Sequence, residues 1–333
     1  MKIKKIKKIL NFGNSYIKMK NRKSFIIGIK STKLSTSEIN FLNKYKPWGV
    51  ILFSRNIKNI KQTKILTQSI RNIFKDHKYP ILLDQEGGRV NRLNNIIDFS
   101  IFTGAFFGKL FKKNKKNFKK YFKIYIQQTS YLLDKIGINI NTVPILDVRR
   151  KKSTNIIGDR SYSNNPMIVS KIGDFCIEEF HKLNIGTVIK HIPGHGSAKV
   201  DSHLSTPIIN EKLNKLFKVD FLPFKNKKSF FSMTAHIVYA DIDKLNTATH
   251  SKKIISLIRN KINYKNIIIS DDISMKGLKY SIKKNTIKAF RAGCNLVLHC
   301  NANNAEMKIV AENSSFLDKF TIKKTSQFYK ILR

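Results

Sequence analysis

The sequence predicts an α/β fold, and specifically a single (β/α)8 barrel. Eight short apolar runs alternate with longer amphipathic segments along the 333-residue chain. The runs are almost continuously apolar, as is typical of strands in a parallel sheet that is covered on both faces. Polar residues stand at or directly after the ends of these runs, and in a parallel barrel all such ends meet at one face. An open doubly wound sheet is the alternative architecture.

The individual elements are expected where the apolar runs and the helical periodicity fall. The predicted strands are residues 24–29, 49–54, 80–84, 140–147, 185–190, 230–237, 266–271 and 295–300. The predicted helices are residues 35–44, 59–74, one or two helices within 102–135, 165–183, 213–224, 252–262 and 282–292. Ser35 or Ser37 is expected to cap the first helix. Residues 302–333 are predicted to form a last helix and a basic tail.

No linker or composition shift divides the chain, so one domain is expected. Residues 24–333 are assigned to the barrel and residues 1–23 to a basic, disordered extension, which lacks the features of a secretory signal. The alternative for this extension is a short amphipathic helix at a membrane surface. The three cysteines show no CxxC pair, and no apolar run is long enough to span a membrane. A cytoplasmic monomer is therefore expected.

The formal net charge of +43 is extreme and would suit a polyanionic partner. However, only eleven of the 64 basic residues are Arg, and the Lys residues are spread along the whole chain. Lys, Ile and Asn are all abundant, which indicates drift toward AT-rich codons. No nucleic-acid-binding motif accompanies the charge, so nucleic acid is not expected as the primary partner.

The stretch KHIPGHGSAKVDSHLSTP, residues 190–207, carries the densest cluster of chemical side chains. It follows a predicted strand and opens into a long loop, the usual place for functional residues. Asp201 and His203 are two residues apart, so in an extended loop the carboxylate can orient the imidazole and raise its basicity. The competing interpretation is a metal site that uses His191, His195, Asp201 and His203. Pro193 and Gly194 weaken it, because they exclude a helical His-x-x-x-His arrangement.

Carboxylates and arginines at other strand ends are further candidates. Asp84 ends a predicted strand and is followed by Arg92 in LLDQEGGRVNRL, while Arg160 lies in IIGDRSY. These side chains could bind sugar hydroxyls or a carboxylate, or they could form structural ion pairs. In IIISDDISM, one of Asp271 and Asp272 is expected to face the site while the other holds structure. A carboxylate at a barrel mouth is a good covalent nucleophile.

These motifs together resemble the β-N-acetylhexosaminidases of glycoside hydrolase family 3, enzymes that remove N-acetylglucosamine in bacterial cell-wall recycling. The matching blocks are KHIPGHGSAKVDSH, GVILFSRN, LLDQEGGRVNRL, NTVPILDV, IIGDRSY, MTAHIVYADID and IIISDDISM, in the family's order over residues 49–275. The resemblance implies the single-domain branch of the family, which consists of (β/α)8 barrels.

The resemblance also implies a role for each matching residue. Asp271 corresponds to the nucleophile, His203 to the proton donor and acceptor, and Asp201 to the residue that orients His203. The implied substrate contacts are Asp84, Arg92, Arg160, Lys190 and His191. No cofactor or metal is implied.

The expected reaction is therefore retaining exo-hydrolysis through a covalent glycosyl-aspartyl intermediate. The implied substrate is N-acetylglucosaminyl-β-1,4-anhydro-N-acetylmuramic acid, with or without its stem peptide. A His-Asp pair in the acid/base role departs from the common two-carboxylate pattern. Two alternatives remain at this point: a metal-dependent barrel hydrolase, and a catalytically inactive protein that binds polyanions.

Overall fold

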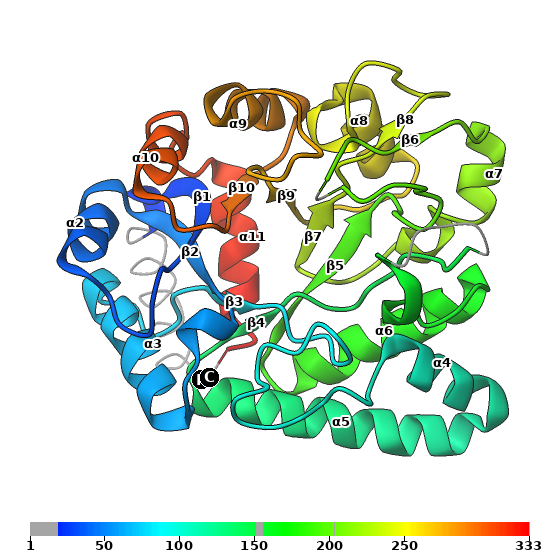
Figure 1. The fold of residues 1–333 in the computed structure, drawn as a ribbon, viewed down its shortest axis with the longest axis horizontal. Coiled ribbons are helices and arrows are strands. Elements are labelled where there is room, and N and C mark those ends of the chain that lie inside the picture. Colours follow the sequence, from blue (N-terminus) through cyan, green and yellow to red (C-terminus); the bar gives the residue numbers. More distant parts are fainter. Residues whose placement is uncertain (1–18, 151–155, 203, 333) are drawn as a thin grey trace, which may run out of the picture.

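The computed structural model describes residues 19–150, 156–202 and 204–332. Within these residues, eight parallel strands close into a barrel in the order β1-β10-β9-β7-β5-β4-β3-β2, and helices surround it (Figure 1). The predicted (β/α)8 barrel is confirmed. The open-sheet alternative is wrong, because β1 pairs with β2 on one side and with β10 on the other.

All eight predicted strands are present, with shifted ends. They are β1 (Lys23–Gly28), β2 (Pro47–Leu52), β3 (Ile81–Leu83), β4 (Ile140–Asn141), β5 (Gly186–Ile192), β7 (Phe231–Thr234), β9 (Ile267–Asp272) and β10 (Leu296–His299). The fourth is much shorter than the predicted run 140–147. Pro144 has no N–H to donate to the ladder, and pairing continues beyond it only as an isolated bridge between Ile145 and Lys190.

Most helices of the described chain follow the predicted ranges closely, but the one predicted for residues 213–224 ends at Lys218, and Leu222–Phe224 forms a separate 3-10 helix. The α-helices are α2 (Thr36–Tyr45), α3 (Ile60–Phe74), α4 (Gly104–Lys113), α5 (Lys115–Lys135), α6 (Pro166–Lys182), α7 (Leu213–Lys218), α8 (Lys252–Asn260), α9 (Ile282–Ala292), α10 (Asn304–Glu312) and α11 (Lys319–Tyr329). Ser35 caps α2 in a capping box with Glu38. The region 102–135 forms two helices, because Asn114 ends α4 and its side chain caps α5.

A small second sheet lies outside the barrel and was not predicted. Strand β6 (Ile208–Ile209) pairs in parallel with β8 (Val238–Tyr239), which joins the loop after β5 to the loop after β7. Each strand has only two residues, which is too short for a periodic pattern. The pairing fixes the end of the loop that begins with His191 and contains Asp201.

Two apolar clusters stabilise the barrel. One lies between the strands and the outer helices, and the other fills the barrel interior. The inner cluster includes Ile26, Trp48, Phe231 and Leu296, all with no exposed surface. This is a packed core of the kind expected for eight-stranded barrels and leaves no pore.

Helix α11 closes the N-terminal end of the barrel. In Figure 1 it lies in the middle of the ring of strands, and its residues Ile322 and Phe328 belong to the inner cluster. The indole Nε1 of Trp48 donates to the hydroxyl of Thr325 at 2.9 Å. The prediction of one helix and a basic tail for residues 302–333 is wrong: two helices form there, and the second is half buried because its apolar side chains cover the open end.

The last residues of the predicted extension pack as part of the folded barrel. Met19 is fully buried, and the guanidinium of Arg22 lies 2.5 Å from the carboxylate of Asp76. The hydroxyl of Tyr329 accepts from Arg22 and donates to Asp76, so the two ends of the chain meet there. Residues 1–18 lie outside the described residues.

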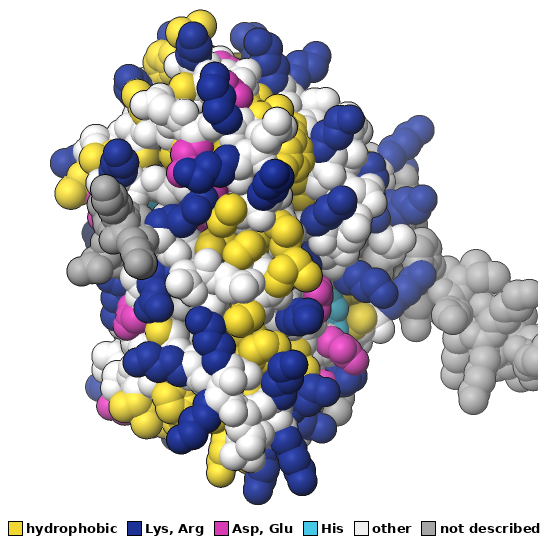
Figure 2. Space-filling model, turned by 90° about the vertical axis from the view of Figure 1, so that its right-hand side faces the viewer, with side chains coloured by type: hydrophobic (Ala, Val, Ile, Leu, Met, Phe, Trp, Pro, Cys, Tyr) yellow, Lys and Arg dark blue, Asp and Glu magenta, His cyan; other side chains and the backbone are white. Residues whose placement is uncertain are grey.

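The surface carries its charge without a single dominant patch on the face that Figure 2 shows. Lys and Arg side chains are scattered over this face and alternate with apolar and neutral surface. In the described part of the chain, no helix is both long and apolar enough to cross a membrane.

Candidate active site

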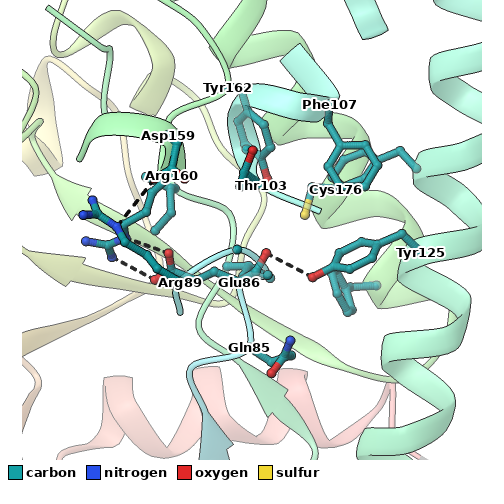
Figure 3. Close-up of a pocket in the computed structure, with 17 residues that line it drawn as sticks. Gln85, Glu86, Arg89, Thr103, Phe107, Tyr125, Asp159, Arg160, Tyr162 and Cys176 are labelled. Carbon is teal, nitrogen blue, oxygen red and sulfur yellow. Dashed lines mark hydrogen bonds and ion pairs between the residues drawn. The ribbon is translucent and has the colours of Figure 1, made fainter. Parts of the chain in front are cut away.

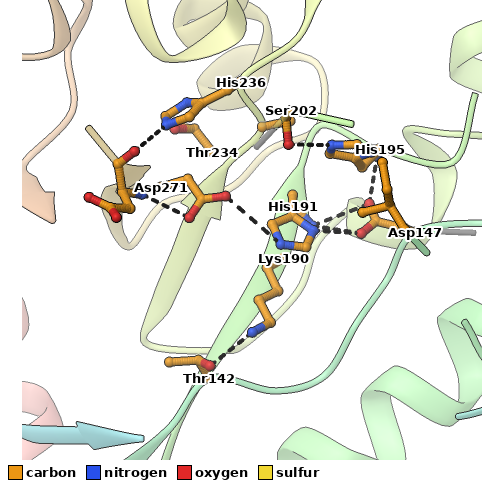
Figure 4. A network of polar contacts seen from close by, with 12 residues as sticks. Thr142, Asp147, Lys190, His191, His195, Ser202, Thr234, His236 and Asp271 are labelled. Atoms are coloured by element: carbon orange, nitrogen blue, oxygen red, sulfur yellow. Dashed lines mark hydrogen bonds and ion pairs between the residues drawn. The ribbon is translucent and has the colours of Figure 1, made fainter. Parts of the chain in front are cut away.

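The predicted site residues gather at the C-terminal ends of the strands. Asp84 directly follows β3, Lys190 and His191 lie in β5, and Asp271 lies in β9. Because the strands are parallel, these ends open on the same face of the barrel. Figure 4 shows Asp271, His191 and Lys190 converging from β9 and β5.

Asp271 faces the site and Asp272 does not. The Asp271 Oδ2 atom lies 4.0 Å from Nε2 of His191, and its Oδ1 accepts the backbone N–H of Asp272. The Asp272 carboxylate is occupied by Ser274 and by the backbone N–H of Cys300, so it holds the loop after β9. This division follows from the alternation of side chains along a strand.

The electrostatic surroundings keep Asp271 ionised. Burial by itself would raise the pKa of this carboxyl, but the nearby His236 and His191 rings and the Asp272 N–H outweigh it and lower the pKa below its usual value. Lys190 contributes in the same direction. At neutral pH Asp271 is therefore a carboxylate, the form that can attack as a nucleophile.

Asp147 holds His191 in one orientation. Its Oδ2 lies 2.7 Å from Nδ1 of His191, and its side chain has no exposed surface. The carboxylate is an acceptor, so Nδ1 carries a proton and donates to it, while Nε2 faces Asp271. Burial would raise the pKa of Asp147, but His191 and His195 keep it lowered.

Lys190 is the centre of a second group of charges. Its Nζ lies 2.8 Å from Asp84 Oδ1, 2.8 Å from Glu86 Oε1 and 3.0 Å from the Thr142 hydroxyl. Thr142 also donates to Asp84. Burial opposes the charge on Lys190, but Asp84 and Glu86 outweigh it and raise the pKa of the amine. The reciprocal effect lowers the pKa of Asp84, against its own burial.

Two arginines complete this charged group. Arg160 donates from Nε and Nη2 to the two carboxylate oxygens of Glu86, at 2.8 Å each. Nη2 of Arg92 lies 3.8 Å from Oδ2 of Asp84. The Arg160 side chain is 12% exposed and that of Arg92 is 31% exposed. Arg92 therefore has more surface left for a ligand, while Arg160 is largely committed to Glu86.

The cavity behind the Glu86–Arg160 pair is too small for a sugar. Its volume is about 20 Å³, and Figure 3 shows it between Arg160 and the rings of Phe107, Tyr125 and Tyr162. A space of this size holds about one water molecule. The phenol of Tyr125 donates to the backbone carbonyl of Glu86 and so supports this wall from behind.

Six of the eight predicted site residues thus lie at this face in two groups of contacts, one around Lys190 and Glu86 and the other between His191 and Asp271. They are Asp84, Arg92, Arg160, Lys190, His191 and Asp271. Asp201 lies in the segment after β5, where its carbonyl accepts the N–H groups of Leu204 and Ser205. His203 lies outside the described residues, so its assigned role stays a prediction.

Asp147 and Glu86 were missed as site residues. Asp147 is the last residue of the predicted strand 140–147, and Glu86 lies in LLDQEGGRVNRL, the block that contains Asp84 and Arg92. A second acid two residues after Asp84 in an extended segment points to the same side as the first, and that spacing was the available signal for Glu86. The His191 contact of Asp147 spans 44 residues, and no local pattern indicates it.

The described residues contain no cluster of three or more His, Cys, Asp or Glu side chains arranged to hold a metal ion. Nδ1 of His191 is bonded to Asp147, and Nε2 of His195 is 3.1 Å from the Ser202 hydroxyl. His203 was one of the four predicted ligands and lies outside these residues. The metal alternative therefore remains open to experiment.

A closed parallel barrel with an ionised carboxylate and paired cations at its mouth is the arrangement of a barrel glycoside hydrolase. The chain belongs to glycosyl hydrolase family 3, whose N-terminal domain matches residues 5–325. The family resemblance seen in the sequence is confirmed, and the polyanion-binding alternative loses its basis.

Individual relatives agree with this assignment. The β-hexosaminidase of Actinobacillus pleuropneumoniae serotype 5b is 32% identical over 297 residues, which cover 86% of this chain and 83% of that protein. NagZ from Neisseria gonorrhoeae in complex with N-trifluoroacetyl-D-glucosamine superposes with a TM-score of 0.82 at 26% identity, covering 92% and 90%. The same protein in complex with zinc ion gives a TM-score of 0.79 at 26% identity over the same shares.

Proposed function

We propose that this family-3 glycoside hydrolase is a retaining exo-β-N-acetylglucosaminidase. Its substrate would be muropeptides, namely N-acetylglucosaminyl-β-1,4-anhydro-N-acetylmuramic acid with or without the stem peptide. It would act as a monomer in the cytoplasm, in cell-wall recycling. The similarity to a β-hexosaminidase and to a protein that binds an N-acylglucosamine supports the choice of sugar.

The observation that carries the proposal is the state of Asp271. This carboxylate is ionised and partly buried, with 17% of its side chain exposed, and it faces the mouth of the barrel beside His191. Its neighbour Asp272 is fully engaged with the loop after β9, so only one of the two carboxylates is directed at a ligand. A single poised carboxylate suits covalent attack on the anomeric carbon.

The proposed mechanism has two steps. Asp271 attacks the anomeric carbon while His203, oriented by Asp201, gives a proton to the departing oxygen. In the second step His203 accepts a proton from water, which attacks the anomeric carbon and releases Asp271. Asp271 and the resemblance to the family support this mechanism. The position and the charge of His203 are not used as support.

The proposed substrate contacts have distinct chemical capacities. The His191 ring, which Asp147 holds through Nδ1, can form a hydrogen bond with a sugar hydroxyl through Nε2. Asp84 can also accept, and the exposed part of Arg92 can donate. The Lys190 amine already has three acceptors, in Asp84, Glu86 and Thr142, so it is proposed to contact the substrate in place of one of them. Arg160 is proposed to use N–H groups beyond the two bound to Glu86.

The first test is hydrolysis of a chromogenic N-acetyl-β-glucosaminide beside the matching β-glucoside. Turnover of the first and little turnover of the second is expected. Equal rates, or no turnover of either, would contradict the proposed activity. Release of N-acetylglucosamine from the anhydromuramyl disaccharide, with and without peptide, then tests the proposed natural substrate.

The second test addresses the nucleophile and the acid separately. Asp271→Ala should abolish turnover for every leaving group. His203→Ala should accumulate a glycosyl-enzyme with an activated aryl substrate, because departure then needs little acid help while the second step still lacks its base. Mass spectrometry should find one N-acetylhexosamine on the peptide that carries Asp271. An Asp271→Ala enzyme that still turns over would rule the scheme out.

A further inference from the structure

His195 is a buried histidine at the barrel mouth that the proposed mechanism does not use. It lies just after β5 and is 3% exposed. Its backbone N–H donates to Oδ1 of Asp147 at 2.6 Å, and its ring Nε2 lies 3.1 Å from the hydroxyl of Ser202, which is also 3% exposed. Figure 4 shows the ring between Asp147 on one side and Ser202 on the other. His195 thus links the carboxylate that orients His191 to the segment that contains Asp201.

The protonation state of the His195 ring follows from its surroundings. Burial, with His191 nearby, lowers the pKa of the ring to about 4, so it is neutral near pH 7. Nδ1 is buried and has no hydrogen-bond partner in the described chain. A buried acceptor without a partner is tolerated better than a buried N–H without one, so the proton belongs on Nε2. Nε2–H therefore donates to the oxygen of Ser202.

The segment around Ser202 has a second attachment. The hydroxyl of Thr206 donates to the carbonyl of Gly277 at 2.9 Å, in the loop that follows Asp271. Gly277 itself lies close to the Ser202 carbonyl, because a Cβ there would come within 2.5 Å of that oxygen. The chain on both sides of residue 203 is thus tied to the two strands that carry His191 and Asp271. Ser202 is the attachment that is adjacent to residue 203 in the sequence.

We propose that His195 and Ser202 are positioning residues for the acid/base step. Their hydrogen bond fixes the backbone next to His203 relative to Asp147, and hence relative to His191 and the attacking carboxylate. The proposal rests on the proposed role of His203 as proton donor. Neither His195 nor Ser202 touches the substrate, and both act through the placement of the neighbouring imidazole. A misplacement of a catalytic group by about 1 Å costs on the order of a hundredfold in rate.

The chain offers a matched control for this proposal. Ser197 lies in the same loop after β5, and its hydroxyl donates to the carboxylate of Asp220 at 3.0 Å and 3.1 Å. Ser197→Ala and Ser202→Ala therefore remove the same group from the same loop. Only the second breaks the bond to His195. For the ring, His195→Gln keeps an N–H donor near the position of Nε2, whereas His195→Leu removes it.

The test compares N-acetyl-β-glucosaminides with a poor leaving group (phenol) and an activated one (dinitrophenol), using kcat/KM, which reports the first chemical step. Ser202→Ala should lose roughly tenfold to a hundredfold with the phenyl substrate and much less with the dinitrophenyl substrate. His195→Leu should show the same pattern and His195→Gln should restore most of the rate. Ser197→Ala should change both substrates little and equally.

Two results would overturn the proposal. One is a loss of the same size on both substrates for Ser202→Ala and His195→Leu, since this indicates a general structural role. The other is a Ser202→Ala loss no larger than that of Ser197→Ala. A wild-type enzyme that turns over neither substrate instead refutes the proposed function, so the two failures are distinguishable.

Discussion

At the scale of single residues, the site depends on carboxylates that serve two partners each. Asp147 accepts from the ring of His191 and from the backbone N–H of His195, and Glu86 accepts from Lys190 and Arg160. Neither carboxylate is directed at a ligand. Each instead fixes the geometry and the proton of groups that are, so their removal should change the site without removing a proposed substrate contact.

The first prediction at this scale concerns Glu86 and pH. Burial would raise the pKa of this carboxyl, but Arg160 and Lys190 lower it from 4.5 to about 2. Because the folded pKa is lower, its stabilising contribution is complete above about pH 4.5 and is lost as the pH falls toward 2. Glu86→Gln leaves two buried cations short of a partner and should cost about 3–5 kcal/mol at pH 7.

The measurement is urea unfolding of both proteins at pH 7, 5 and 3. The stability difference between wild type and Glu86→Gln should shrink between pH 5 and pH 3, because Glu86 takes up a proton in the unfolded wild type while it stays ionised in the folded protein, which favours unfolding. A difference that stays constant over this range would show that the Glu86 charge does not stabilise the fold.

The second prediction at this scale is independence from metal ions. The His-Asp cluster is assigned to proton transfer and substrate contact, and the described residues contain no three His, Cys, Asp or Glu side chains arranged to hold a metal ion. Exhaustive treatment with a strong chelator should leave the turnover of N-acetyl-β-glucosaminides unchanged. Loss of activity that returns when zinc is added would favour the metal-dependent alternative.

At the scale of elements, the sequence predicts the barrel strands of the described chain well. It does not predict the small sheet of β6 and β8 or the buried face of α11. The eight strands were predictable because each is a nearly continuous apolar run with a polar end. Strands β6 and β8 could not be predicted, since two residues are too few to show a periodic pattern of apolar side chains. Helix α11 (KFTIKKTSQFY) mixes cations with apolar residues, and only the open end of the barrel determines which of its faces is buried.

The same distinction applies to the site. Asp84, Lys190, His191 and Asp271 could be predicted because they end strands or lie beside strand ends. The Asp147–His191 and Glu86–Arg160 contacts could not be predicted, because their residues are 44 and 74 positions apart in the sequence. Which polar side chains face the ligand and which hold another side chain is decided by tertiary packing.

The prediction for this scale concerns α11. Phe328 has no exposed surface and packs edge-on against Phe231 inside the barrel, with ring centroids 5.2 Å apart. Phe328→Ala should lower the free energy of unfolding by about 3–5 kcal/mol, because it leaves a cavity in the inner cluster. Turnover per folded molecule should be unchanged, since α11 covers the end of the barrel opposite the site.

Phe320→Ala on the same helix is the matched control. Phe320 is 38% exposed, so its removal should cost about 0.5 kcal/mol. Urea unfolding of the two variants provides the comparison. Equal costs for the two phenylalanines would mean that α11 does not close the barrel in solution.

At the scale of the whole molecule, the two ends of the chain complete the barrel together. Strand β1 pairs with β10, and Arg22 and Asp76 meet Tyr329 of α11. Lys78 takes part in this closure, because its Nζ donates to the backbone carbonyls of Tyr329 and Leu332. The Lys and Arg side chains on the face shown in Figure 2 are scattered over it. Their distribution agrees with the compositional explanation of the +43 charge.

The prediction for the whole molecule is that the fold begins at Met19. Deletion of residues 1–18 should leave turnover and stability nearly unchanged. Deletion of residues 1–22 removes Arg22 and leaves the Asp76 carboxylate buried without its cation, which should cost about 3–5 kcal/mol. Turnover and thermal unfolding of both truncations are the measurements. A large loss of activity in a folded protein that lacks only residues 1–18 would contradict this boundary.

The meeting of the two chain ends has a consequence for synthesis in the cell. Arg22 and Tyr329 are 307 residues apart, so a growing chain exposes the free edge of β1 until the ribosome has nearly finished. During that time the side chains that will fill the barrel have no cover, and an open apolar sheet edge readily pairs with other chains. Newly made protein should therefore depend on chaperones that bind nascent chains. Messages that end before α11 should yield aggregates and no shortened enzyme.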